Sequence, residues 1–159
     1  MRLEPEGRLR LLDVVTATSQ RERDDAFAVR IAVFVEEQKI PREEELDDLD
    51  AEAVHCVAYD DGTTVGAGRL VLPHGPGPGE EYGKIGRMAV LAAHRSRGIG
   101  AAVLDALERE GAARGVRLFR LSAQLTARGF YDRRGYTAAG ESYDEVGIPH
   151  IAMEKRLVT

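Results

Sequence analysis

The sequence contains a single cysteine, Cys56, so no disulfide can form within the chain. This composition is typical of a protein in a reducing compartment. The four histidines are scattered along the chain and have no second cysteine beside them, so no zinc-binding pattern is present. No apolar run approaches the roughly 20 residues that a membrane-spanning helix needs. Residues 1–10 carry charges without an apolar stretch behind them, which does not indicate a secretion signal. We therefore expect a cytoplasmic protein that binds no metal and no membrane.

The chain also lacks an excess of positive charge, because 27 acidic side chains against 22 lysines and arginines give a formal net charge of −5. Non-specific binding to nucleic acid depends on a basic face that neutralises phosphates, so we expect no nucleic-acid partner. The charge is unevenly distributed. Residues 36–52 contain nine acidic side chains against one lysine and one arginine, whereas residues 87–134 are rich in arginine. One region could therefore repel anions while another attracts them.

The length and the periodicity of apolar residues predict one compact domain of mixed secondary structure. Ser19 and Glu22 have the spacing of a capping box at the start of a helix. Gly115 and Gly135 are suited to end two later helices. The expected strands cover residues 9–15, 54–59, 65–72, 85–90, 118–123, 138–143 and 150–157, the expected helices cover 20–35, 99–114 and 126–134, and residues 73–83 form a loop. This order predicts an α/β fold with a mixed sheet.

The most informative segment follows the strand over residues 85–90, where a short glycine-rich loop leads into a helix. The first amides of a helix lack internal acceptors and carry partial positive charge. Gly98 and Gly100 have no Cβ, so backbone N–H groups can approach a phosphate closely. Arg95 and Arg97 add charge suited to phosphate oxygens. The segment therefore predicts a site for a diphosphate, although a tight turn that begins a helix would explain the glycines without a ligand.

Two common diphosphate sites are disfavoured. A dinucleotide-binding loop requires a third glycine where this sequence has Val103, and an acidic residue that is missing at the end of the strand over residues 118–122. A nucleotide-binding P-loop requires a Gly-Lys-Ser or Gly-Lys-Thr sequence, which is also missing. A dinucleotide-dependent oxidoreductase is therefore disfavoured.

Two motifs carry a resemblance to a known family. Arg95-x-x-Gly98-x-Gly100 is similar to the acyl-CoA signature of the GCN5-related N-acetyltransferase (GNAT) superfamily, and residues 127–136, Ala-Arg-Gly-Phe-Tyr-Asp-Arg-Arg-Gly-Tyr, are similar to its downstream segment. Further motifs, including Glu45-x-Asp47-x-x-Asp50 and Gly147-Ile148-x-His150, resemble the ElaA-like branch, so that the match extends from about residue 30 to residue 157. The resemblance implies that residues 1–159 form a single GNAT domain, with a mixed, mostly antiparallel sheet flanked by helices.

The resemblance also implies a site for acetyl-CoA. The main chain of the strand over residues 85–90 would pair with the pantetheine arm, and the glycine-rich loop would hold the pyrophosphate. Gln124 stands where many members of the superfamily have asparagine, so its contact with the arm is a departure from the family pattern. The implied cofactor-binding residues are Met88, Ala89, Val90, Arg95, Ser96, Arg97, Gly98, Ile99, Gly100, Ala101 and Gln124.

Amide formation from a thioester needs a neutral amine, a stabilised oxyanion and a protonated leaving group. The resemblance places Tyr131 near the sulfur as the general acid, with packing against the sheet as the alternative role for this aromatic pair, Phe130-Tyr131. A primary amine is mostly protonated at neutral pH, so a base is needed. The side chains considered as bases are Glu37, Glu45, Asp47, His55 and His150, of which we retain His150 and Glu45. Solvated surface acids and a core histidine at residue 55 are the competing explanations.

We therefore predict an acyl-CoA-dependent N-acetyltransferase, which transfers an acetyl group to a primary amine by direct attack in a ternary complex. The acceptor would be a small molecule or a peptide, and the acidic segment suggests a cationic one. Two alternatives stay open: a non-catalytic acyl-CoA-binding module that regulates, and an acyltransferase of the acyl-homoserine-lactone-synthase type. Homodimers are common in the superfamily, but no feature of the sequence demands one.

Overall fold

The computed structural model describes residues 2–3, 9–72 and 81–158. The main sheet has the strand order β3-β4-β5-β6-β7-β10-β8, with β9 paired to β10. Its strands are β3 (Leu12–Thr16), β4 (Val54–Asp60), β5 (Thr63–Val71), β6 (Gly83–Val90), β7 (Leu118–Gln124), β8 (Thr137–Ala138), β9 (Tyr143–Glu145) and β10 (Ile148–Arg156). A separate ribbon pairs β1 (Arg2–Leu3) with β2 (Leu9–Arg10). All neighbouring pairs are antiparallel except β6 and β7, which confirms the predicted mixed, mostly antiparallel sheet.

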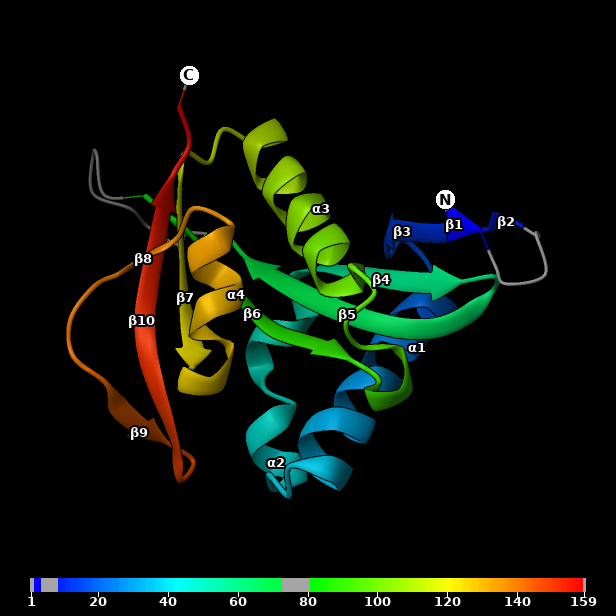
Figure 1. Ribbon diagram of the computed structural model, residues 1–159, viewed down its shortest axis with the longest axis horizontal. Helices are drawn as coiled ribbons and strands as arrows, with labels where there is room; N and C mark the ends of the chain where they lie inside the picture. The colour runs from blue at the N-terminus through cyan, green and yellow to red at the C-terminus, as the bar shows by residue number, and fades with distance from the viewer. Residues whose placement is uncertain (1, 4–8, 73–80, 159) are drawn as a thin grey trace.

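Helices cover both faces of this sheet (Figure 1). The helical segments are α1 (Gln20–Arg30), η1 (Ile31–Glu37), α2 (Arg42–Glu45), η2 (Asp48–Ala51), η3 (Ala92–His94), α3 (Ile99–Ala113), η4 (Leu125–Ala127) and α4 (Arg128–Arg133). The buried side chains of α1 and η1, such as Val29 and Val33, form one apolar core. Those of α3 and α4, such as Val103 and Tyr131, belong to a second core. The sheet therefore lies between two helical layers, as predicted for an α/β fold.

The first helix begins where the capping box predicts, because Ser19 and Glu22 exchange hydrogen bonds with each other's backbone amides. The predicted end of this helix at residue 35 is wrong, because α1 ends at Arg30 and a different helical form follows it. The chain continues as a π-helix through Glu37, and Gln38 closes this segment by donating its N–H to the carbonyl of Val33 at 3.0 Å. π-helical turns are rare, and they are frequently found at functional sites. Here it brings Gln38 to the groove described below.

Helix α3 packs closely on the sheet because it contains small residues. The predicted apolar stripe is confirmed, with Val103 and Leu107 fully buried. A Cβ added to Gly111 would lie 2.5 Å from the ring of Phe119 on β7, so only glycine fits at this contact. Gly115 follows the helix with φ +86°, which confirms its predicted role as the terminating glycine.

Two expected strands are interrupted. The strand predicted over residues 9–15 divides into β2 and β3 because Leu11 exchanges hydrogen bonds with Asp61 in the β4–β5 turn. The strand predicted over residues 138–143 is wrong, because Gly140 has φ +111° and takes the chain out of the extended conformation between β8 and β9.

Most of the expected loop over residues 73–83, namely residues 73–80, lies outside the described residues, and Gly83 already belongs to β6. Within the described ranges, no helix is long and apolar enough to cross a membrane.

Candidate active site

A gap opens in the middle of the sheet where β6 and β7 separate. The two strands pair only over Gly83–Ile85 and Phe119–Leu121, and then they diverge (Figure 1). Strands in a regular sheet lie about 4.8 Å apart and satisfy each other's main-chain groups. Past this short pairing, the facing edges of β6 and β7 can instead receive an extended ligand.

A bulge in β6 directs its main chain toward the gap. The register between β5 and β6 shifts next to Arg87, which has φ 54°, an uncommon conformation for a residue with a side chain. Beyond the bulge, Leu91 donates its N–H to the carbonyl of Val65 on β5 at 2.9 Å. Alternate residues of a strand direct their main-chain groups to opposite neighbours. The N–H and C=O groups of Val90 and Met88 therefore face the gap rather than β5.

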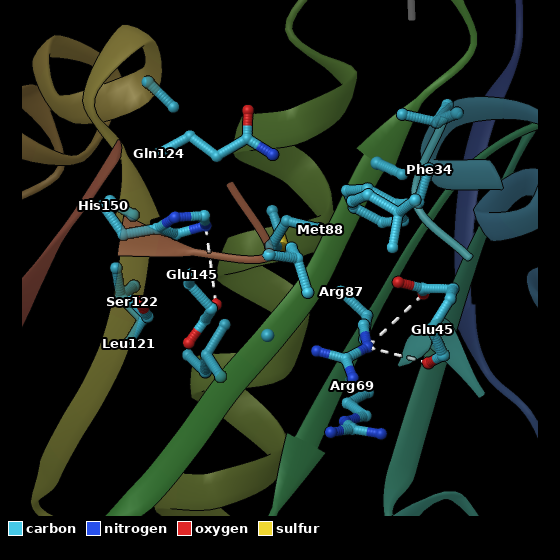
Figure 2. Close-up of a pocket in the computed structure, with 18 of the residues that line it drawn as sticks. Phe34, Glu45, Arg69, Arg87, Met88, Leu121, Ser122, Gln124, Glu145 and His150 are labelled. Carbon is cyan, nitrogen blue, oxygen red and sulfur yellow. Dashed lines mark hydrogen bonds and ion pairs between the residues drawn. The ribbon is translucent and has the colours of Figure 1, made fainter. Parts of the chain in front are cut away.

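The gap is part of a groove of about 590 Å³, shown in Figure 2. One wall comes from η1, α2 and β6, and the other from β7, β9 and β10. The groove brings together several residues that were predicted from the sequence: Glu45, Met88, Ala89, Val90, Arg95, Gln124, Tyr131 and His150. A hydrogen bond crosses the groove, in which Nε2 of Gln124 donates to Oε1 of Gln38 at 2.9 Å. The predicted residues from Ser96 to Ala101 do not line the groove but surround the first turn of α3.

The start of α3 has the features of an anion site. Gly98 is the N-cap residue, with φ +81°, and no side chain caps the helix there. A Cβ placed on Gly98 would meet nothing within 4 Å, so the space above this residue is open. Ile99 is buried in the core, which fixes the first turn from below. The residues therefore fit a pyrophosphate, which would accept hydrogen bonds from the free amides of this turn.

The two arginines of the loop have different surroundings. Arg95 makes two hydrogen bonds to the carboxylate of Glu37, at 2.7 and 2.8 Å, and its Nε donates to the carbonyl of Val90 at 2.9 Å. These bonds lower the pKa of Glu37, which makes Glu37 a poor base at neutral pH. Arg97 is more than a third exposed and lies 4.0 Å from the buried carboxylate of Asp60. Arg95 thus ties the loop to η1, whereas Arg97 lies beside the open first turn.

Tyr131 lies on α4 at the inner wall of the groove. It packs edge to face against Phe130 and Tyr136, with ring centroids 5.0 and 5.8 Å apart. Burial raises the pKa of Tyr131, because the phenolate would lose its hydration. The hydroxyl therefore keeps its proton at neutral pH, as a proton donor must.

A largely buried cluster of charged side chains, here called the charge network, forms part of the wall opposite β7 and β10. Its members are Arg30, Glu45, Asp47, Asp50, Arg69 and Arg87. Arg30, which is 1% exposed, donates to the Glu45 and Asp50 carboxylates at 2.8 Å each. Arg87 donates from Nε to the Glu45 carbonyl at 3.1 Å, so the network also holds the bulge. Three acids of the 36–52 segment therefore balance three arginines, and the segment presents less negative charge to the groove than its composition suggests.

The acids of the network differ in their readiness to take a proton. Burial raises the pKa of Glu45, despite the hydrogen bond from Arg30. Burial alone would also raise the pKa of Asp50, but hydrogen bonds from Arg30 and Arg69 outweigh it and lower the pKa to about 2. Hydrogen bonds from Arg69 lower the pKa of Asp47. Of these three acids, only Glu45 keeps an environment suited to a base.

The two histidines considered as bases lie in different places. His55 is buried behind the network, within 2.9 Å of the Asp50 carbonyl and edge to face with Phe27, and burial lowers its pKa. It does not line the groove, so the explanation as a core histidine is confirmed. His150 lines the groove, with its Nε2 3.5 Å from a carboxylate oxygen of Glu145 (Figure 2). Of these two histidines, His150 is the one that lines the groove.

The three arginines of the network and Glu145 were not predicted from the sequence. The available signal for Arg30 was its place between Phe27 and Phe34 on the apolar side of a helix, where an unpaired charge would be costly. No comparable signal marked Glu145. Within the described ranges, no group of three or more histidine, cysteine, aspartate or glutamate side chains could hold a metal ion.

Comparison with known proteins gives consistent similarities. Residues 18–157 match the family model described as an acetyltransferase (GNAT) domain. The "Uncharacterized N-acetyltransferase YjcF" of Bacillus subtilis (strain 168) is 42% identical over 145 residues, which cover 91% of this chain and 99% of that protein. The crystal structure of an acyl-CoA N-acyltransferase from Pseudomonas aeruginosa is 30% identical, with a TM-score of 0.77 and coverage of 91% of this chain and 99% of that one. Escherichia coli ElaA is 25% identical, with a TM-score of 0.78 and coverage of 93% and 100%.

Proposed function

We propose, from the premise that the chain belongs to the acetyltransferase (GNAT) family and to its ElaA-like branch, that it transfers the acetyl group of acetyl-CoA to a primary amine. The observation that carries this proposal is the open edge of β6, which connects the first turn of α3 with the groove at Tyr131 and His150. A donor with a diphosphate at one end and a thioester at the other could lie along this edge, with the diphosphate at α3 and the thioester in the groove.

The donor would be held mainly by main-chain groups. The first amides of α3 and the side chain of Arg97 would bind the pyrophosphate, and Gly98 would allow it to approach. Met88 and Val90 would hydrogen-bond to the pantetheine arm along the gap. The similarity to the acyl-CoA N-acyltransferase from Pseudomonas aeruginosa supports this class of donor.

The transfer would proceed by direct attack, without a covalent intermediate on the protein. The acceptor nitrogen forms a bond to the thioester carbonyl carbon while a main-chain N–H of β6 stabilises the oxyanion. The bond between carbon and sulfur then breaks, and the sulfur takes the proton of the Tyr131 hydroxyl. The nitrogen gives up its proton to a base, and solvent returns a proton to Tyr131, so the products are the acetylated amine and a free thiol.

His150 is the base that we favour. Its ring faces the groove, and Glu145 beside it can stabilise the charge that the ring acquires. Glu45 is the second candidate because burial raises its pKa. However, its Oε2 lies 2.8 Å from Nε of Arg30 and 3.4 Å from Nε of Arg87, and both contacts favour the unprotonated form without offering a route to an amine.

We infer that the acceptor is a cationic small molecule or a peptide amine. Exposed glutamates line the groove at residues 43, 44 and 145. The exposed cationic side chains among its lining residues are Lys84 and Arg95, and Arg95 is paired with Glu37. Such an arrangement attracts a positive charge over a distance that salt shortens. The value of kcat/KM for a cationic acceptor should therefore fall as salt is added, and a value independent of salt would refute this attraction.

A thiol-release assay tests the proposed function directly. Acetyl-CoA would be offered with polyamines, amino sugars, amino acids and short peptides, and the free thiol and the acetylated product would be measured together. We expect equal amounts of both with at least one amine class. Calorimetric binding of CoA without thiol release from any amine would instead indicate a non-catalytic acyl-CoA-binding module. Turnover only with long acyl chains would refute acetyl transfer.

A further inference from the structure

The hairpin of β9 and β10 places an acidic side chain against the proposed base. Val146 and Gly147 form its two-residue turn and both have positive φ, at 46° and 77°, as a type I′ turn requires. Glu145 is in register with Ile148, and Tyr143 with His150. Residues two apart on a strand share a face, so these four side chains lie on the same face of the hairpin.

The hydrogen bond at the other ring nitrogen determines which nitrogen of His150 can act. Nδ1 lies 2.7 Å from the carbonyl oxygen of Ile148. A carbonyl can only accept, so Nδ1 must carry a hydrogen whether the ring is neutral or charged. In the neutral ring, the lone pair is therefore on Nε2, and that nitrogen lies 3.5 Å from Oε2 of Glu145.

The orientation of the ring is fixed from a second side. The His150 imidazole stacks on the Tyr143 ring, with centroids 6.3 Å apart and an angle of 25° between the planes. The Tyr143 hydroxyl in turn forms a hydrogen bond with Ser122 on β7. His150 itself is only 6% exposed, whereas the side chain of Glu145 is 50% exposed. The ring thus lies inside the groove, and its acidic neighbour extends to the solvent.

We propose that Glu145 is a positioning residue that makes His150 an effective base, an inference that rests on the proposed function. In the transfer step, the acceptor nitrogen forms its bond to carbon and its proton moves to Nε2 of His150. The Glu145 carboxylate stabilises the resulting imidazolium without becoming protonated, and the proton then leaves to water along the exposed side. The other charged side chains that line the groove lie on α2, β5 and β6 and in the loops at Asp47 and Arg95, away from the β9–β10 hairpin.

Three variants separate this role from others. Glu145→Gln removes the charge and keeps the shape, Glu145→Asp keeps the charge, and Asp144→Asn is the matched control, since Asp144 is exposed on the same strand but faces the other way. We expect Glu145→Gln to lower kcat by about tenfold or more, as part of the roughly 10²- to 10⁴-fold contribution of a general base. The Kd for CoA should stay within about twofold, and any rise in the acceptor KM from the lost attraction should be smaller than the loss of kcat. Glu145→Asp should restore part of kcat, and Asp144→Asn should change none of these quantities.

Combination with His150→Gln tests whether the two side chains act together. Residues that act as a unit are not additive, so the double variant should be no slower than His150→Gln alone. Additive losses would overturn the proposal. A higher acceptor KM with unchanged kcat in Glu145→Gln would also overturn it, because Glu145 would then bind the acceptor rather than assist the base.

A measurement on the free protein separates the failure of this proposal from the failure of the proposed function. The ¹⁵N chemical shifts of the His150 ring distinguish the two neutral tautomers without any substrate. A hydrogen on Nδ1 supports the proposed geometry, and a hydrogen on Nε2 overturns it even if the protein is active. If no amine yields free thiol while the Nδ1 tautomer is found, the proposed function fails and the arrangement of the ring stands.

Discussion

Replacement of Arg30 by methionine should cost the protein a large part of its stability. The guanidinium is 1% exposed and makes four hydrogen bonds, to the carboxylates of Glu45 and Asp50 and to the Glu45 carbonyl. Loss of one member of a buried ion pair costs about 3–5 kcal/mol, because the remaining charge is left uncompensated. Methionine preserves most of the apolar stem, so lost packing adds little. Since a domain is stable by only about 5–15 kcal/mol, the effect should be obvious.

Urea unfolding followed by circular dichroism at pH 7 would measure this loss. Arg21→Met is the matched control, because Arg21 is exposed on the same helix, and its effect should stay within about 0.5 kcal/mol. The double variant Arg30→Met/Glu45→Gln should be more stable than Arg30→Met alone. It removes one positive and one negative charge, so the other four members of the charge network stay balanced. A loss below about 1 kcal/mol for Arg30→Met would refute the reasoning.

Acid provides an independent check through Asp50, whose pKa is lowered to about 2 from 3.8. A lowered carboxyl pKa contributes stability above the unfolded value, and that contribution is lost as the pH falls through the folded value. The contribution is about 2 kcal/mol for Asp50, whose side chain is only 12% exposed. Much of it depends on Arg30. The difference in stability between wild type and Arg30→Met should therefore narrow between about pH 5 and pH 2, and a constant difference would contradict this account.

Three further predictions concern the donor site and the core. Gly98→Asp should abolish CoA binding in calorimetry because a carboxylate would face the pyrophosphate. Gly98→Asn, which has the same shape and tolerates positive φ, should retain much more affinity, and equal losses would refute the electrostatic explanation. Tyr131→Phe should lower kcat at least tenfold and leave the Kd for CoA unchanged, whereas full turnover would place the proton donor elsewhere. Gly111→Ala should lower the free energy of unfolding by about 1–3 kcal/mol, because its Cβ would lie 2.5 Å from Phe119, and a neutral effect in urea unfolding would show that the ring can move.

Features with local causes could be predicted from the sequence. The capping box at Ser19, the glycine at residue 115 and the stripe of α3 each depend on residues a few positions apart, and each is confirmed. The open space at Gly98 is likewise a property of the loop itself. For these features, sequence neighbours are also neighbours in space.

Features that depend on pairing between distant segments could not be predicted. Arg95 forms a hydrogen bond with Glu37, which is 58 positions away in the sequence, and Arg87 forms one with Asp47, which is 40 positions away. Nothing in the local pattern of residues 36–52 distinguishes an acid that meets a buried arginine from one that meets water. The register shift at Arg87 has no sequence signal either, because it depends on how two strands are aligned.

The short contact between β6 and β7 has a consequence for the mechanical integrity of the protein. Among the described residues, strands β3 to β6 are paired with the rest of the sheet through three register pairs, Gly83–Ile85 with Phe119–Leu121. A pantetheine arm in the gap would act as a missing strand and bridge the two halves. Donor binding would then stabilise the sheet as well as supply the acetyl group. At a concentration 100 times its Kd, the donor would add about 2.7 kcal/mol to the stability of the folded chain.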